Sequence, residues 1–193
     1  RDLKIYFKND LAYDDLIIKS AGNKRTLYLK FPILKQIGLP ITSTDSNVLH
    51  IRLDFSQNQY ANVNSGISII NAGNLSFAVR RYSIEDLFSG KIAAILTREK
   101  LEGKEKIARF KGRDYFDLIW YLQKNIKPNW DKITQDTKLS KKQTLELLKE
   151  KISIVQKSDL EDDLIPFLQD KSSVTSFAEN FQALAQEYLK RLD

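Results

Sequence analysis

The 193-residue sequence contains no cysteine, no methionine and a single histidine. The absence of cysteine excludes disulfides and cysteine-ligated zinc, and one histidine excludes a histidine-rich metal site. The sequence has no apolar run of membrane-spanning length and no signal peptide, so we expect a cytoplasmic protein without a membrane segment. Because the chain starts at Arg1 and lacks an initiator methionine, we expect it to be part of a longer native protein.

Glycine and proline are also scarce, with 7 and 4 residues, whereas 42% of the residues are hydrophobic. A chain of this length and composition can bury one sizeable core and a second, smaller one. The 31 basic residues exceed the 25 acidic residues, which gives a net charge of +6. This modest excess is compatible with a partner rich in phosphate groups, although many soluble proteins are as basic without binding nucleic acid.

Residues 84–96 have the spacing of a helix with one apolar stripe. The stripe consists of Ile84, Leu87, Phe88, Ile92, Ile95 and Leu96. Ser83 is the expected N-cap, with Asp86 three residues later as in a capping box. Lys91 falls inside the stripe, so its ammonium group must either reach water along its aliphatic stem or meet a negative partner.

A second helix is predicted to begin at Arg113, and its first turns contain Asp114 and Asp117. The two aspartates lie one turn apart on one face, near a helix N-terminus that favours negative charge, and Arg113 can pair with Asp117 or with a phosphate group. Taken singly, these residues are polar groups paired at a helix start, and Lys91 is a lysine that reaches solvent. Together, a lysine in an apolar stripe and a carboxylate pair on a neighbouring helix suit a site for phosphate and metal.

Two strings, SIEDLFSGKIAAILTR (83–98) and KGRDYFDLIWYL (111–122), resemble the second half of the AbiEii-like nucleotidyltransferases. These proteins are the toxin components of type IV toxin-antitoxin and abortive-infection systems, and the resemblance is specific over residues 76–123. It implies that Lys91 and Arg113 bind the nucleotide, with Lys91 at the triphosphate. It also implies that Asp114 and Asp117, in the R-D-x-x-D segment, are catalytic.

The family also carries a glycine-containing motif and an Asp-x-Asp motif, which hold the catalytic metal ions on the first strands. Neither motif occurs in this sequence, since the nearest carboxylate cluster, Asp14 and Asp15, lacks both the spacing and the preceding Gly-Ser or Gly-Thr turn. We therefore expect the C-terminal part of such an enzyme, inactive by itself, or a relative that has lost its metal-binding half.

Most of the first eighty residues are predicted to form strands, including a hairpin across the turn at residues 21–24. The expected strands cover residues 3–7, 16–18, 26–31, 47–55, 67–70 and 75–80. On the clearest strand, His50 and Asp54 share the polar face, which by itself indicates contact with water. The resemblance implies that Asp54 helps to hold the metal, because a later strand carries a third carboxylate in many nucleotidyltransferases.

Residues 56–74 are polar and are predicted to be a loop around the short strand, and residues 99–112 a solvated, charged connector. Further helices are expected at residues 140–156, 160–168 and 174–192. The prediction is an α+β fold, with a partial, mixed nucleotidyltransferase-like sheet in residues 1–125 and a helical subdomain in residues 126–193.

With the resemblance, the sequence predicts a nucleotidyltransferase-like toxin that uses Mg²⁺ and an NTP to modify RNA. The resemblance implies tRNA as the acceptor and a cognate antitoxin as a partner. The alternative is a non-catalytic module on the same scaffold that binds nucleic acid or an antitoxin, and the missing Asp-x-Asp motif supports it. A metal-dependent nuclease is disfavoured, because no strand carries a Glu-x-Lys pair after a strand with an aspartate.

Overall fold

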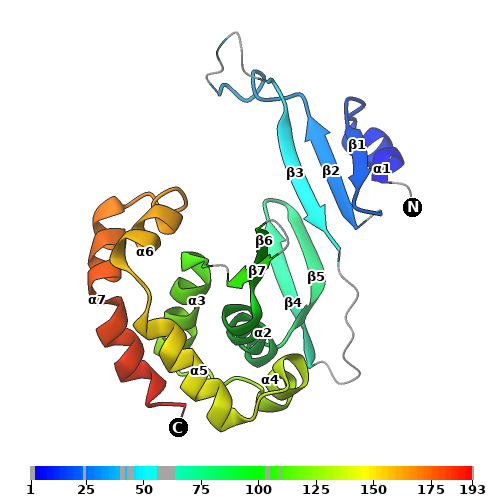
Figure 1. Cartoon of the computed structure of the whole chain (residues 1–193). Coiled ribbons are helices and arrows are strands. Elements are labelled where there is room, and N and C mark those ends of the chain that lie inside the picture. The colour runs from blue at the N-terminus through cyan, green and yellow to red at the C-terminus, as the bar shows by residue number, and fades with distance from the viewer. Residues whose placement is uncertain are drawn as a thin grey trace. The chain divides into compact units, whose positions relative to one another are not determined.

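In the computed structural model, the chain forms two compact units, Arg1–Ala61 and Asn62–Asp193 (Figure 1). The structure describes residues 3–23, 25–39, 42, 46–55, 64–102, 105–108 and 110–192. These residues contain seven helices and seven strands, which confirms the predicted α+β class. None of the helices in this described part is long and apolar enough to cross a membrane.

The first unit contains a three-stranded antiparallel sheet. Strands β1 (Ile17–Ala21), β2 (Thr26–Phe31) and β3 (Leu49–Asp54) follow one another in the sheet in chain order. The predicted hairpin of β1 and β2 is confirmed, and Gly22 adopts a φ of +57° in its turn, a conformation that favours glycine. The small core of this unit is formed by Leu16, Leu29 and Phe31.

Leu3–Leu11 form helix α1, so the strand predicted to start at Leu3 is wrong. Phe7 is the α1 residue that packs on the small core, where its ring centroid lies 5.4 Å from that of Phe31. Leu3 and Ile5 are exposed, so their alternation does not correspond to a buried sheet face. A helix satisfies its backbone hydrogen bonds locally, whereas a strand needs a neighbouring strand to do so.

The second unit begins with a long antiparallel hairpin of β4 (Ser65–Ala72) and β5 (Leu75–Tyr82). Strand β5 agrees with the prediction, whereas β4 extends well beyond the short strand predicted at residues 67–70. Gly73, with a φ of +56°, lies in the two-residue connection and lets the strands pair over their full length. Pairing with a neighbour therefore extends β4 beyond its isoleucine-rich centre to the small and polar residues at its two ends.

A hairpin of β6 (Glu99–Glu102) and β7 (Glu105–Ala108) occupies the region predicted to be an irregular connector. That prediction is wrong because strand pairing uses backbone groups, which charged side chains do not remove. Every strand pairing in the described ranges is antiparallel. The strands therefore form three separate antiparallel groups in place of the predicted mixed sheet.

The rest of the second unit is helical. Its described helices are α2 (Ile84–Thr97), α3 (Gly112–Gln123), α4 (Trp130–Thr137), α5 (Lys141–Ser153), α6 (Lys157–Leu164) and α7 (Lys171–Leu189). All of them except α4 were predicted, with shifts at their ends, whereas α4 was not predicted from the sequence. Ser83 caps α2 as predicted, since its hydroxyl accepts the Asp86 backbone N–H at 3.1 Å. Ser140 and Gln143 form a complete capping box at the start of α5.

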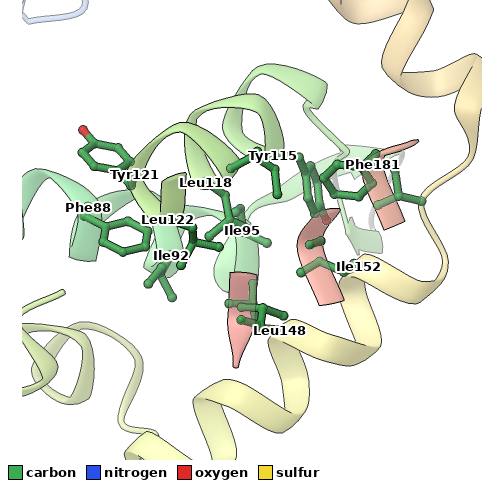
Figure 2. Close-up of a cluster of buried hydrophobic side chains, with 14 of the residues drawn as sticks. Phe88, Ile92, Ile95, Tyr115, Leu118, Tyr121, Leu122, Leu148, Ile152 and Phe181 are labelled. Carbon is green, nitrogen blue, oxygen red and sulfur yellow. The ribbon is translucent and has the colours of Figure 1, made fainter. Parts of the chain in front are cut away.

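Helices α2 and α3 share one hydrophobic core with α4 to α7 (Figure 2). Phe88 and Ile92 of α2 are fully buried, as their places in the stripe predicted. The Phe88 ring stacks on that of Tyr121 in α3, with 4.7 Å between centroids. The helices after residue 125 thus pack directly on α2 and α3, which carry the two strings. The predicted division into residues 1–125 and 126–193 stays a prediction.

Gly112, the first residue of α3, lies very close to α6. A β-carbon added to Gly112 would lie 3.2 Å from Asp163 Cβ and 3.5 Å from Leu160 Cα. A β-carbon added to Gly90 in the middle of α2 would have nothing within 4 Å. The missing side chain at Gly112 therefore allows α3 and α6 to pack at this distance.

We expect Gly112→Ala to lower the free energy of unfolding by about 1–2 kcal/mol, because the added methyl group must push α6 away. Gly90→Ala should have the opposite sign and stabilise the protein by up to about 1 kcal/mol, since alanine is the better helix former in open space. Urea denaturation of the two variants measures both values. Equal effects would contradict the close packing of α3 against α6.

Candidate functional site

Lys91 lies on α2, inside the apolar stripe predicted from the sequence. Phe88 and Ile92, on the same stripe, are fully buried, and Ile95 is 7% exposed. The Lys91 side chain itself is 35% exposed, so it lies at the border between the core and solvent. Its ammonium group can therefore meet both a protein carboxylate and a ligand.

The Lys91 ammonium group bridges the two aspartates of α3. Its Nζ lies 2.6 Å from Asp117 Oδ2 and 3.2 Å from Asp114 Oδ1. Burial alone lowers the pKa of Lys91, but the hydrogen bond and attraction from Asp117, followed by those from Asp114, outweigh burial and raise it. Of the two environments that the sequence allowed for Lys91, the structure therefore has the one with negative partners.

Asp114 is the buried centre of the cluster, with 3% of its side chain exposed. Its Oδ1 meets Lys91, and its Oδ2 lies 3.0 Å from Nη2 of Arg98, the C-cap residue of α2. Sequence reasoning did not single out Arg98. It lies seven residues after Lys91, two helical turns along the same face, and that spacing is the signal that identifies it.

Arg113 is bound to α6 and not to Asp117. Its Nε lies 3.7 Å from Asp163 Oδ2, and its backbone N–H donates to the same oxygen at 3.1 Å. The guanidinium also lies over the Phe167 ring, 3.8 Å from the ring centroid. Of the two partners that the sequence allowed for Arg113, Asp117 is not the one found, since Asp117 meets Lys91. The Asp163 carboxylate satisfies an N-terminal N–H of α3 from the neighbouring helix.

Asp54, the predicted metal ligand, lies on β3 in the first unit, whereas the other predicted site residues lie in the second. Its Oδ1 accepts from the Thr26 hydroxyl at 2.7 Å and from Arg52 Nε at 3.0 Å. The Thr26 hydrogen bond, followed by that from Arg52, lowers the pKa of this carboxyl. A metal ion at Asp54 would have to displace these contacts or share the carboxylate with them.

A second buried polar cluster holds the first half of α2. The Asp86 carboxylate accepts from the Asn64 backbone N–H at 2.9 Å and from Asn129 Nδ2 at 2.8 Å. The Ser89 hydroxyl accepts the Asn129 backbone N–H at 2.7 Å. Both Asp86 and Ser89 are buried, so these bonds compensate for their loss of water and fix α2 to the start of α4.

The charges of the candidate site suit an anion. Both oxygens of Asp114 and one oxygen of Asp117 already face the cations Lys91 and Arg98. No group of three or more His, Cys, Asp or Glu side chains in the described residues could hold a metal ion. The aspartates of α3 thus hold cations, and the partly exposed lysine next to them has the charge that an anion would require.

Comparison with known families gives one match. The family described as "Nucleotidyl transferase AbiEii toxin, Type IV TA system" matches residues 5–192. The match extends well beyond residues 76–123 and includes all six helices of the second unit. No curated protein and no solved structure matches the chain.

We expect Asp114→Ala to lower the free energy of unfolding by roughly 2–3 kcal/mol. Removal of one partner from a fully buried ion pair costs about 3–5 kcal/mol, and here Lys91 and Arg98 can partly regain water. Asp117→Ala should cost less than about 1 kcal/mol, because Asp117 is 39% exposed. Urea denaturation of both variants measures the difference. A larger loss for Asp117→Ala would contradict the central position of Asp114.

Proposed function

Because the chain belongs to the AbiEii nucleotidyl transferase toxin family of type IV toxin-antitoxin systems, we propose that it transfers nucleotides from an NTP to RNA. The proposed acceptor is tRNA, as the resemblance implies, and the proposed regulatory partner is a cognate antitoxin. The net charge of +6 is compatible with an acceptor rich in phosphates.

The observation that carries this proposal is the half-exposed Lys91 ammonium held by two aspartates. An ammonium group has three N–H donors, and Asp114 and Asp117 occupy two of them. The third donor remains for a phosphate oxygen, and the raised pKa keeps the group charged at neutral pH. A fixed cation next to the triphosphate stabilises the negative charge that develops as pyrophosphate leaves.

The two aspartates have different proposed roles. Asp114 is buried and both of its oxygens are paired, so we assign it the positioning of Lys91 and Arg98. Asp117 is the more exposed of the two, and we assign it the contact with the acceptor. Arg113 remains a proposed nucleotide contact whose guanidinium is oriented by Asp163 and Phe167.

Family membership implies the use of divalent metal ions in general. The described residues do not supply a ligand set for such an ion, because no cluster of candidate ligands is present among them. Asp54 is a single exposed carboxylate that is already bonded to Thr26 and Arg52, and its role as a metal ligand stays a prediction. The proposed contact of Lys91 with the nucleotide and the proposed positioning role of Asp114 therefore do not involve a metal ion.

A non-catalytic module that binds nucleic acid or an antitoxin is the second candidate function. It is favoured by the lack of an Asp-x-Asp motif in the sequence and of a metal-ligand cluster in the described residues. Transfer of label from NTP to RNA distinguishes it from the first candidate.

The test is incubation of the full-length protein with labelled NTPs, Mg²⁺ and total tRNA, because this chain alone is expected to be inactive. We expect label to enter RNA and Lys91→Ala to lower kcat/KM by at least about 100-fold, the scale for loss of one fixed donor at the developing charge. The matched control is Lys157→Ala, since Lys157 of α6 is also held by two carboxylates, those of Glu179 and Glu161. The control should transfer label like the wild type. Absence of transfer with all four NTPs, together with binding of RNA, would favour the non-catalytic module.

A further inference from the structure

Lys111 is a cation next to the candidate site that has no side-chain partner among the described residues. It is the N-cap residue of α3, three residues before Asp114, and it is partly buried. Within the described part of the chain, no hydrogen bond or ion pair engages its side chain, whereas Lys91, Arg98 and Arg113 all have carboxylate partners. A partly buried lysine without a counter-ion is costly unless a ligand supplies the negative charge.

Lys111 lies next to the buried carboxylate of the site, because the Asp114 backbone N–H donates to the Lys111 carbonyl oxygen at 3.0 Å. The electrostatic surroundings of its ammonium group agree with this position. The pKa of Lys111 is lowered, and burial is the largest cause. Attraction by Asp114 opposes this shift, whereas repulsion by Arg98, Arg113 and Lys91 adds to it. Four cations thus lie around three carboxylates, those of Asp114, Asp117 and Asp163. The carboxylates already have cationic partners, so the excess positive charge is that of Lys111.

Arg98 adds a second feature that suits an anion with several oxygens. Lys91 and Arg98 bind the two oxygens of one buried carboxylate, so their charged groups are held side by side at a fixed separation. The Arg98 side chain is 26% exposed, and only its Nη2 is engaged by Asp114. A guanidinium with free N–H groups binds phosphate oxygens in pairs, and an ammonium binds them as a point charge.

We propose that Lys111 and Arg98 form, together with Lys91, a polyphosphate-binding cluster that holds the triphosphate of the NTP. This inference rests on the proposed function, which assigned only Lys91 to the triphosphate. A triphosphate carries several charges on a short chain of oxygens, which matches three cations around one buried carboxylate. The N-terminus of α3, at Lys111, adds a favourable partial positive charge.

The first test is titration calorimetry of the full chain with sodium tripolyphosphate in the absence of metal. We expect the wild type to bind and Lys111→Gln to bind about tenfold more weakly, the loss of one partly screened, charge-assisted hydrogen bond. Lys111→Gln breaks no ion pair within the described residues, so the variant should fold normally. The matched control is Lys132→Gln, because burial also lowers the pKa of Lys132 but its ammonium is paired with Asp136 at 2.8 Å.

The second test addresses Arg98, whose removal also affects Asp114. Arg98→Gln should weaken tripolyphosphate binding about tenfold, and Arg98→Lys should restore part of the affinity because it keeps the charge. A purely structural role of Arg98 predicts instead that the affinity of the folded fraction, measured alongside urea denaturation, stays unchanged. That result would remove Arg98 from the cluster and overturn the proposal.

In the transfer assay, Lys111→Gln should raise the KM for the NTP about tenfold and change kcat less than twofold, because it weakens binding in the ground state and the transition state alike. Binding of tripolyphosphate that depends on Lys111, without any nucleotide transfer, would support the cluster while contradicting the proposed function. Unchanged tripolyphosphate affinity in Lys111→Gln overturns the cluster. The cluster is also overturned if Lys111→Gln weakens only the binding of RNA, since these residues would then bind RNA and not the nucleotide.

Discussion

The candidate site depends on the buried carboxylate of Asp114. With 3% of its side chain exposed, this group is stable only because Lys91 and Arg98 neutralise one oxygen each. The two cations lie two turns apart, with Lys91 in the middle of α2 and Arg98 at its C-cap, and the carboxylate comes from the first turn of α3. The same interaction therefore joins the two helices and sets the positions of the two cations.

The C-terminal helices support this arrangement from outside the site. Asp163 of α6 binds both the backbone and the side chain of Arg113, and α6 reaches this position because Gly112 has no side chain. Asn129 at the start of α4 plays the same part for α2 through Asp86 and Ser89. The buried polar residues thus hold the helices together, whereas the Lys91 side chain also reaches solvent.

Features that depend on residues close together in the sequence were predicted correctly, whereas features that depend on distant residues were not. The helix starts at Ser83 and Ser140 were predictable, because a cap and the apolar spacing that follows it lie within a few residues. The start of the chain at Leu3–Leu11 and the hairpin of β6 and β7 were predicted wrongly. Alternation and charge describe the side chains, whereas strand formation depends on whether another strand is available for the backbone.

For the site, the local pattern placed Lys91 in an apolar stripe and the two aspartates on one face of the next helix, and it required that the lysine find water or a negative charge. It did not decide which cation meets which carboxylate, because those partners lie 23 residues apart for Lys91 and Asp114 and 50 residues apart for Arg113 and Asp163. Only the packing of α2, α3 and α6 around a shared core made these choices. The same packing places Lys111 beside the cluster without an ion pair to any described carboxylate, a feature that appears only when the charges from separate helices are brought together.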